Sequence, residues 1–189
     1  MPHDWSNTGF DTRAIHAGQD PEPQYGAVVV PIYQTSTFAQ PSPGEHLGHE
    51  YTRTSNPTRD ALQECLAAVE GGRHAMCFAS GLAATNAVIA TLSAGDTVLA
   101  MDDMYGGTFR LFDKVWKRHG IHFKYADLRD VDAFDAACDD TVKLLWLETP
   151  TNPMMKLVDI AALSAKAKAR GVTVAVDNTF ATPYLQNPL

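Results

Sequence analysis

Asp177 is the first candidate for chemistry in this sequence, because it directly follows the apolar run Val172–Val176. Such a run is typical of a strand buried on both faces of a sheet. In open α/β sheets, ligands bind at the carboxyl ends of the strands. A buried carboxylate without a partner is costly, so Asp177 should face a cation, a hydrogen-bond donor or water. The alternative is that Asp177 only caps the next turn.

A second candidate stretch, Ser80-Gly81-Leu82, lies between a predicted strand at 75–79 and a predicted helix. The N–H groups and the dipole at a helix N-terminus attract anions, and the Ser80 hydroxyl adds a donor. A lone Ser-Gly pair is only a weak signal for such a site. The sequence contains neither GxGxxG nor GxxxxGK[ST], which argues against a dinucleotide or a P-loop nucleotide.

Tyr51 and Arg53 form a third candidate stretch, just before a helix predicted to start at Asn56-Pro57 and to end at Gly71-Gly72. Their alternate spacing would aim both side chains the same way if the chain is extended. Arginine is suited to bidentate recognition of phosphate. The alternative is a surface arginine beside a half-buried tyrosine.

The elements that must position these residues alternate between strand and helix. Apolar runs predict strands at 75–79, 97–101, 122–125, 143–147 and 172–176. Helices are predicted at 57–70, from 81 onward, and at 109–118, 131–138 and 158–170. Repeated βα units predict a mostly parallel sheet with helices on both faces, which is an α/β fold.

Residues 1–48 differ from the rest, because they are rich in Pro, Gly and Gln and poor in periodicity. The apolar patch Val28–Tyr33 interrupts them. A long irregular arm of this kind indicates a segment that packs on a neighbouring subunit, with simple N-terminal disorder as the alternative. We therefore expect an arm at 1–48 and a domain at 49–189.

Composition narrows the class of protein. The 189 residues are 45% hydrophobic and carry a net charge of −7 without a basic cluster, which disfavours nucleic acid and anionic membranes as partners. No apolar run is long enough to cross a membrane, and residues 1–10 do not resemble a signal peptide. Three widely spaced cysteines in apolar surroundings indicate reduced core residues of a cytoplasmic protein. The histidines show no metal-ligand spacing, so no metal is assigned.

Taken together, the chain resembles the Cys/Met-metabolism family of pyridoxal 5′-phosphate (PLP) enzymes. The resemblance covers nearly the whole chain. It is carried by YTRTSNPTR at 51–59, FASGLAAT at 78–85, DDMYGGTFRLF at 102–112, ETPTNP at 148–153 and AVDNTF at 175–180. It implies PLP as the cofactor and the large domain of the aspartate aminotransferase-like, fold-type-I transferases.

The resemblance also assigns roles to residues at the phosphate of the cofactor. It places the Ser80 hydroxyl and the backbone N–H groups of Gly81 and Leu82 around that phosphate. Tyr51 and Arg53 would reach the phosphate of the neighbouring subunit's cofactor. The implied assembly is a homo-oligomer, at least a dimer and expected to be a tetramer made of two dimers.

At the cofactor ring, the resemblance implies that Tyr105 stacks on the pyridine, that Asn152 contacts the O3′ side and that Thr179 lies nearby. Asp177 would pair with the pyridinium nitrogen and keep the ring protonated, which strengthens it as an electron sink. The positive ring would favour the phenolate of Tyr105. Tyr105 is therefore expected to act as an acid or base on the γ-leaving group, rather than as a packed aromatic alone.

One departure from the family is large. The lysine that forms the Schiff base lies in a Ser-Ala-Thr-Lys-like stretch beyond the DNTF motif, and the chain ends at Leu189 before reaching it. The domain that binds the substrate carboxylate is missing as well. We therefore expect an N-terminal portion of a longer polypeptide. No role is transferred to the lysines present in predicted strands and helices, Lys143, Lys156, Lys166 and Lys168.

Within the family, Gly107 replaces the cysteine of methionine γ-lyases, whereas HAGQDPE at 16–22 and ETPTNP are closer to γ-lyases than to enteric γ-synthases. The expected activity is γ-elimination on cystathionine, giving cysteine, 2-oxobutyrate and ammonia. Alternatives are γ-replacement on O-acyl homoserine with cysteine, or a non-catalytic fragment. The position of Asn152-Pro153 in a Pro-x-x-Pro loop after a strand predicts a cis peptide bond that aims Asn152 at the ring.

Overall fold

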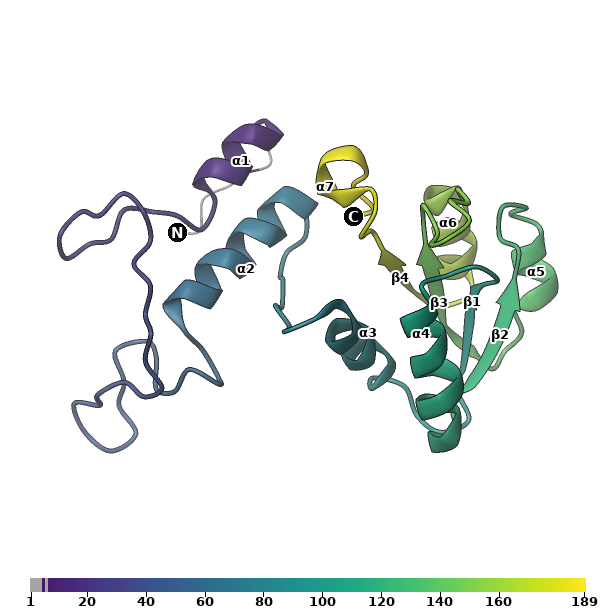
Figure 1. Ribbon diagram of the computed structural model, residues 1–189, viewed down its shortest axis with the longest axis horizontal. Coiled ribbons are helices and arrows are strands. Elements are labelled where there is room, and N and C mark those ends of the chain that lie inside the picture. Colours follow the sequence, from purple (N-terminus) through teal and green to yellow (C-terminus); the bar gives the residue numbers. More distant parts are fainter. Residues whose placement is uncertain (1–4, 6) are drawn as a thin grey trace. The chain divides into compact units, whose positions relative to one another are not determined.

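The computed structural model describes residue 5 and residues 7–189, which divide into two compact units (Figure 1). The first unit is Met1–Cys77 together with Leu189, and the second is Phe78–Pro188.

The first unit contains two helices, α1 (Phe10–His16) and α2 (Pro57–Glu70). The start of α2 is fixed by Asn56, whose side chain accepts a hydrogen bond from the Thr58 N–H at 2.9 Å. Its end is fixed by Gly71, which adopts the left-handed conformation with φ of 74°. The predicted helix is thus confirmed, whereas α1 was not predicted. It lies next to α2, where the Arg13 guanidinium donates to the Ala68 carbonyl at 3.1 Å.

The second unit is built on a four-stranded sheet in the order β2-β1-β3-β4, and every neighbouring pair is parallel. The strands are β1 (Thr97–Met101), β2 (His122–Ala126), β3 (Val142–Glu148) and β4 (Thr173–Asp177). The predicted parallel α/β architecture is confirmed. In the register of β3 and β4, Glu148 lies opposite Asp177, so the two carboxylates end adjacent strands.

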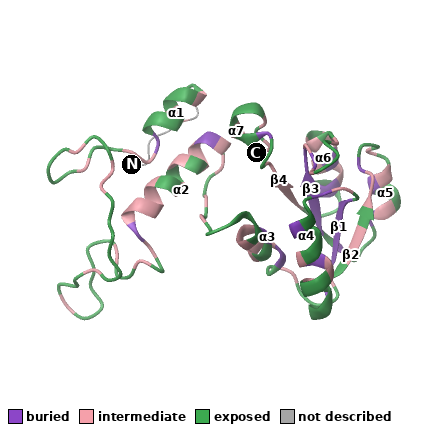
Figure 2. Ribbon diagram, in the orientation of Figure 1, coloured by how far each residue is buried: buried purple, intermediate pink, exposed green. Residues whose placement is uncertain are grey.

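Helices cover both faces of this sheet. Successive side chains of a strand point to opposite faces, so each strand contributes to both helix-covered cores. Leu99 and Met101 of β1 belong to a core with residues of α5 (Ala133–Ala137) and α6 (Ile160–Ala169). Val98 and Ala100 pack with residues of α3 (Gly81–Ile89) and η1 (Leu111–Val115). The central strands β1 and β3 are accordingly the most buried part of the unit (Figure 2).

The helical segments of the second unit follow the predicted order with altered bounds. They are α3 (Gly81–Ile89), α4 (Gly106–Arg110), η1 (Leu111–Val115), η2 (Trp116–His119), α5 (Ala133–Ala137), α6 (Ile160–Ala169) and α7 (Thr182–Leu185). The helix predicted at 109–118 begins earlier, at Gly106, and then passes into a π turn and a 3₁₀ turn. It ends where Gly120 adopts a left-handed conformation.

The prediction of a strand at 75–79 is wrong, because this stretch has no regular secondary structure. Apolar composition alone does not make a strand, whose N–H and C=O groups need a neighbouring strand. The Cys77 N–H instead donates to the Gln63 side chain of α2 at 3.0 Å. Met76 is 79% exposed, so the segment also lacks the burial that the prediction assumed.

The expectation that the strand before Asp177 is buried on both faces is also wrong. In β4, Thr173 is exposed and the residues from Val174 to Asp177 are only half-buried. The physical reason is that β4 is the last strand in the sheet order, where β3 is its one partner among the described residues. Of the three cysteines, only Cys138 lies in the core, and Cys65 and Cys77 are half-buried.

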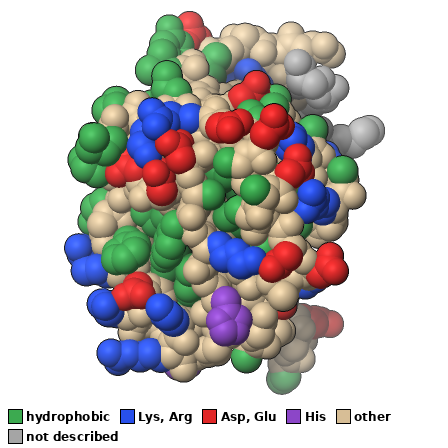
Figure 3. Space-filling view, turned by 90° about the vertical axis from the view of Figure 1, so that its right-hand side faces the viewer, with side chains coloured by type: hydrophobic (Ala, Val, Ile, Leu, Met, Phe, Trp, Pro, Cys, Tyr) green, Lys and Arg blue, Asp and Glu red, His purple; other side chains and the backbone are tan. Residues whose placement is uncertain are grey.

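Acidic and basic side chains lie interspersed on the face that Figure 3 shows. Ion pairs link α5 to α6, where Lys166 contacts Asp132 and Asp135, and Arg170 contacts Asp135 at 2.9 Å. In the part of the chain that the structure describes, no helix combines the length and the apolar character needed to span a membrane.

Candidate active site

A cavity of about 360 Å³ opens at the carboxyl end of the sheet in the second unit. It is lined by Ser80, Gly81, Leu82, Thr85, Tyr105, Thr108, Glu148, Pro150, Asn152, Asp177, Thr179 and Phe180. Every site residue predicted from the sequence that belongs to the second unit therefore lines this cavity. This volume is near the lower end of the range typical of small-molecule and cofactor sites.

One wall of the cavity is the N-terminus of α3. Ser80 caps this helix, and its Oγ accepts a hydrogen bond from the Ala83 N–H at 3.2 Å. A Cβ built at Gly81 would have no heavy atom within 4 Å, so the backbone there is open to a ligand. The helix dipole and the first N–H groups of α3 can receive an anion at this point.

Asp177 lies at the end of β4, and Thr179 fixes the orientation of its carboxylate. The Thr179 N–H and hydroxyl donate to Asp177 Oδ1 at 3.1 and 2.5 Å. Among the described residues, both hydrogen bonds to this carboxylate reach the same oxygen, which leaves Oδ2 to accept from a ligand. Asp177 thus caps the following turn and also faces the cavity, so the two alternatives drawn from the sequence are compatible.

Tyr105 lies directly before α4, and its phenol ring lies against Gly107. A Cβ built at Gly107 would be 2.3 Å from Tyr105 Cε1, so the ring position depends on a residue without a side chain at 107. Tyr105 is 45% exposed. It therefore presents a face that a flat ligand could cover.

Asn152 is part of the loop that follows β3. The Asn152–Pro153 peptide bond is cis, as predicted, and so is the Thr149–Pro150 bond, which was not predicted. The Asn152 N–H donates to Glu148 Oε1 at 2.8 Å.

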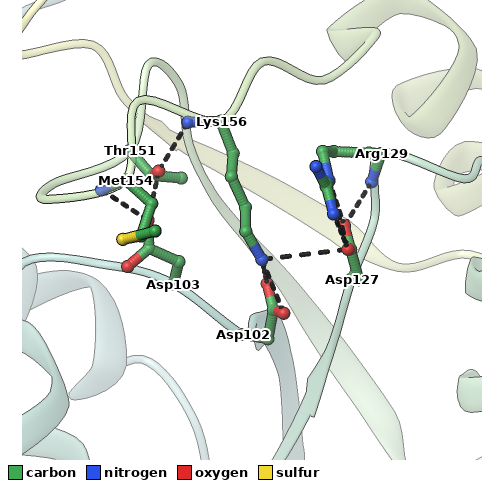
Figure 4. Close-up of polar contacts among 7 residues, drawn as sticks. All are labelled: Asp102, Asp103, Asp127, Arg129, Thr151, Met154 and Lys156. Carbon is green, nitrogen blue, oxygen red and sulfur yellow. Dashed lines mark hydrogen bonds and ion pairs between the residues drawn. The ribbon is translucent and has the colours of Figure 1, made fainter.

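The same loop is tied to the ends of β1 and β2 by carboxylates (Figure 4). Asp103 accepts from the Thr151 hydroxyl and, at 3.1 Å, from the Met154 N–H. The Lys156 ammonium lies 2.7 Å from Asp102 and 3.8 Å from Asp127. The Arg129 guanidinium beside Asp127 holds the pKa of that carboxyl well below its usual range. Lys156, to which the sequence gave no role, thus anchors the loop that carries Asn152.

Glu148 is a charged lining residue that sequence reasoning did not identify as functional. It is only 4% exposed, and both of its oxygens accept from the Tyr105 N–H, at 3.0 and 2.9 Å. Burial raises the pKa of its carboxyl, while the N–H groups of Tyr105 and Asn152 partly lower it. The signal that pointed to Asp177, a carboxylate ending an apolar strand, was also present at Glu148.

Tyr51 and Arg53 belong to the first unit, where they border a broad open hollow with Ile32–Ser36, Thr52 and Thr58. Residues 52–54 form a turn, so the condition of an extended chain, on which the parallel aim of the two side chains depended, is not met. The two side chains nevertheless come together, because the Arg53 guanidinium carbon lies 4.9 Å from the centroid of the Tyr51 ring.

The family profile described as Cys/Met metabolism PLP-dependent enzyme matches residues 11–189. The chain belongs to this family. The resemblance inferred from five motifs is therefore confirmed, together with PLP as the family's cofactor.

Individual relatives within the family carry different activity names. The chain is 56% identical over 181 residues to a probable cystathionine gamma-synthase of Herpetosiphon aurantiacus, covering 96% of this chain and 57% of that protein. It is 49% identical over 181 residues to a cystathionine beta-lyase of Coxiella burnetii, covering 95% and 47%. The crystal structure of cystathionine gamma-lyase from Lactobacillus plantarum, complexed with L-serine, matches with a TM-score of 0.92 at 46% identity, covering 96% and 47%.

Two facts follow from these comparisons. The chain spans about half the length of the relatives it matches. The family is common to these relatives, but the reaction is not, since a synthase, a β-lyase and a γ-lyase all match at similar identity.

The residues of the cavity fit the chemistry of PLP. A phosphate suits the capped N-terminus of α3, with its open backbone at Gly81. A protonated ring nitrogen suits the free oxygen of Asp177, and a flat aromatic ring suits the exposed face of Tyr105. In the described part of the chain, no group of three or more His, Cys, Asp or Glu residues is arranged to hold a metal ion.

Proposed function

We propose that the full-length protein is a PLP-dependent enzyme of sulfur amino-acid metabolism that acts at the γ-carbon of cystathionine. The first candidate reaction is γ-elimination, giving cysteine, 2-oxobutyrate and ammonia. The observation that carries the proposal is the single cavity that joins the helix N-terminus at Ser80, the ring of Tyr105 and the carboxylate of Asp177.

At one end of the cavity, Ser80 and the N–H groups of Gly81 and Leu82 bind the cofactor phosphate. Support comes from the N-cap geometry of Ser80 and from the open space beside Gly81. Both the dipole of α3 and the N–H groups at its start favour a dianion at this position.

Asp177 holds a proton on the ring nitrogen through Oδ2, while Thr179 keeps the carboxylate oriented through Oδ1. When bound, PLP supplies an electron sink that stabilises negative charge at the substrate's α-carbon. The negative charge of Asp177 favours the protonated ring, on which the strength of that sink depends.

Tyr105 covers one face of the ring, and its hydroxyl delivers a proton to the sulfur that leaves the γ-carbon. Asn152 contacts the O3′ side of the ring. In support, both residues line the cavity and both are held by the same carboxylate, Glu148.

Product analysis tests the reaction. With cystathionine, we expect the full-length protein to release cysteine, 2-oxobutyrate and ammonia. Release of homocysteine and pyruvate would instead assign β-elimination and contradict the proposal. The chemistry distinguishes them because the two reactions break the C–S bonds on opposite sides of the sulfur.

The second candidate is γ-replacement, which the relative named as a probable cystathionine gamma-synthase favours at 56% identity. It predicts that O-acyl homoserine and cysteine are converted to cystathionine faster than cystathionine is consumed. Comparison of kcat/KM in the two assays decides between the candidates.

We further propose that the active site is shared between subunits, with residues 1–48 packed on a neighbouring subunit and Tyr51 and Arg53 reaching its cofactor phosphate. In support, Val28, Val29 and Ile32, which are close together in the sequence, are 77%, 77% and 81% exposed, and exposed apolar surface is typical of an interaction site. A dimer is the smallest assembly that meets this requirement, and a dimer of dimers is the expected state.

Mixing two inactive variants tests the sharing. Arg53→Ala and Ser80→Ala chains are each expected to be inactive, and their mixed dimers to contain one undamaged site. If subunits exchange at random, about a quarter of all sites should recover, because half of the dimers are mixed and each has one intact site of two. No recovery, with exchange verified by mass labelling, would place both residues in the site of one subunit.

A further inference from the structure

Glu148 is unusual among the charged residues of this protein because it is buried. Among the residues that the structure describes, no other acidic or basic residue is buried; Glu148 is 4% exposed. No ammonium or guanidinium group pairs with it in that part of the chain. A buried carboxylate is costly unless hydrogen bonds compensate, so the groups that contact Glu148 explain why it is there.

The contacts of Glu148 go to the backbone of two lining residues. The Tyr105 N–H lies 3.0 Å from Oε1 and 2.9 Å from Oε2, and the Asn152 N–H lies 2.8 Å from Oε1. Tyr105 precedes α4 and Asn152 lies in the loop after β3, so one side chain joins two separate segments. Hydrogen bonds to a charged acceptor are roughly twice as strong as neutral ones, which suits a fixed geometry.

Two nearby carboxylates further disfavour the negative charge of Glu148. Asp177 is its neighbour across β3 and β4, and the charges of Asp177 and Asp103 add to burial in raising the pKa of Glu148. A neutral or apolar residue would fill this place without that cost. The function of Glu148 should therefore depend on its two acceptor oxygens.

We propose that Glu148 is a positioning residue that sets the backbone of Tyr105 and Asn152 relative to each other, and so fixes how the two side chains meet the cofactor ring. The inference rests on the proposed function, which gives Tyr105 and Asn152 their contacts with that ring. Glu148 itself contacts neither ring nor substrate in this scheme.

Two substitutions separate positioning from simple structural support. Glu148→Ala removes both acceptor oxygens. Glu148→Gln keeps one carbonyl oxygen, which can replace Oε1 and still accept from both N–H groups. Its amide nitrogen then replaces Oε2, which lies 2.9 Å from the Tyr105 nitrogen, and two donors repel there.

Asp139→Asn is the matched control. Asp139 also accepts a backbone N–H, that of Thr141 at 3.1 Å, but it lies before β3, at the opposite end of that strand from Glu148. It lines no part of the cavity.

The first measurement is amide hydrogen exchange, residue by residue, on the full-length protein without cofactor. Glu148→Ala should speed exchange at both Tyr105 and Asn152. Glu148→Gln should speed it at Tyr105 and leave Asn152 close to wild type. Asp139→Asn should change neither amide.

The second measurement is the dissociation constant and absorbance spectrum of added PLP. Loss of the hydrogen bonds to a buried charged acceptor corresponds to roughly a 10- to 100-fold loss of affinity for Glu148→Ala. Glu148→Gln should lie between Glu148→Ala and wild type, and Asp139→Asn should stay within about two-fold of wild type. If Glu148→Ala does not fold, Glu148→Gln alone tests the inference, through faster exchange at Tyr105, unchanged exchange at Asn152 and weaker PLP binding.

The outcomes are distinct. A Glu148→Ala protein that melts at lower temperature but binds PLP with wild-type affinity and spectrum would overturn the inference and leave Glu148 a structural tie. If the wild type binds no PLP, the proposed function fails. Exchange at Tyr105 and Asn152 then still shows whether Glu148 holds the two amides, and wild-type exchange rates in both Glu148 variants would overturn that part as well.

Discussion

Replacement of Asp177 by asparagine is expected to abolish most of the activity of the full-length protein while leaving it folded. The carboxylate is half-buried at the end of β4, and its orientation is set by Thr179. Asparagine has nearly the same shape and can still accept from Thr179, so the fold loses little. It carries no charge, however, and no longer favours a protonated ring nitrogen.

The expected fall in kcat is roughly 10²- to 10³-fold, the size found when one group that stabilises developing charge is removed. Steady-state turnover of cystathionine is the measurement, together with the PLP content and melting temperature of each variant. Thr179→Ser, which keeps the hydroxyl donor to Asp177, is the control and should remain within about three-fold of wild type. Turnover of the Asp177→Asn protein near the wild-type value, at full PLP occupancy, would exclude Asp177 as the partner of the ring nitrogen.

The elements whose ends carry local signals could be predicted from the sequence. Asn56-Pro57 and Gly71 specify both ends of α2, since a cap, a fixed φ and a left-handed glycine act on the backbone locally. The apolar runs of β1 and β3 lie buried between two layers of helices, so for these two strands the apolar run in the sequence matches the structure. Their parallel pairing follows from the intervening helices.

Features that depend on a distant partner could not be predicted in this way. The run at 75–79 has strand-like composition but takes its hydrogen bond from Gln63, a contact that no local pattern encodes. The partial burial of β4 depends on its place in the sheet order. In the cavity, Ser80 was accessible to reasoning from the predicted start of a helix and Asp177 from the end of a strand, whereas Tyr105, Asn152 and Thr179 required the family resemblance.

The role of Glu148 could not be predicted from the sequence. Glu148 was noted as the end of a strand, but its partners are backbone N–H groups, which have no sequence signature. Lys156 was set aside because it lacked the context of the family's lysine, yet it ties the Asn152 loop to Asp102. Supporting residues of this kind become visible only when the folded chain brings distant segments together.

Gly107 provides the second large expected effect, through a pair of neighbouring glycines that differ in their surroundings. Both belong to α4, and neither has a positive φ, so alanine is compatible with the backbone at both positions. A Cβ at Gly106 would meet only the flexible end of Arg110, at 3.3 Å. A Cβ at Gly107 would overlap the Tyr105 ring, at 2.3 Å from Cε1 and 2.9 Å from Cζ.

Gly107→Ala is therefore expected to displace the Tyr105 ring without unfolding the protein, because a side chain moves more easily than the backbone of α4. Gly106→Ala should leave activity unchanged and slightly raise the melting temperature, since alanine in place of glycine at a compatible φ stabilises a protein by about 0.4–1 kcal/mol. If Tyr105 only stacks on the ring, its displacement should weaken PLP binding by roughly 2- to 13-fold, the equivalent of 0.5–1.5 kcal/mol.

The turnover of the PLP-saturated Gly107→Ala protein then separates the two roles of Tyr105. General acid–base groups typically contribute about 10²- to 10⁴-fold, so a fall of that size at full occupancy supports proton delivery to the leaving sulfur. A fall confined to PLP affinity assigns Tyr105 to stacking and transfers the proton to another group. Wild-type affinity and turnover would mean that the ring does not occupy the place beside Gly107 when the cofactor is bound, since no side chain at 107 is compatible with that place.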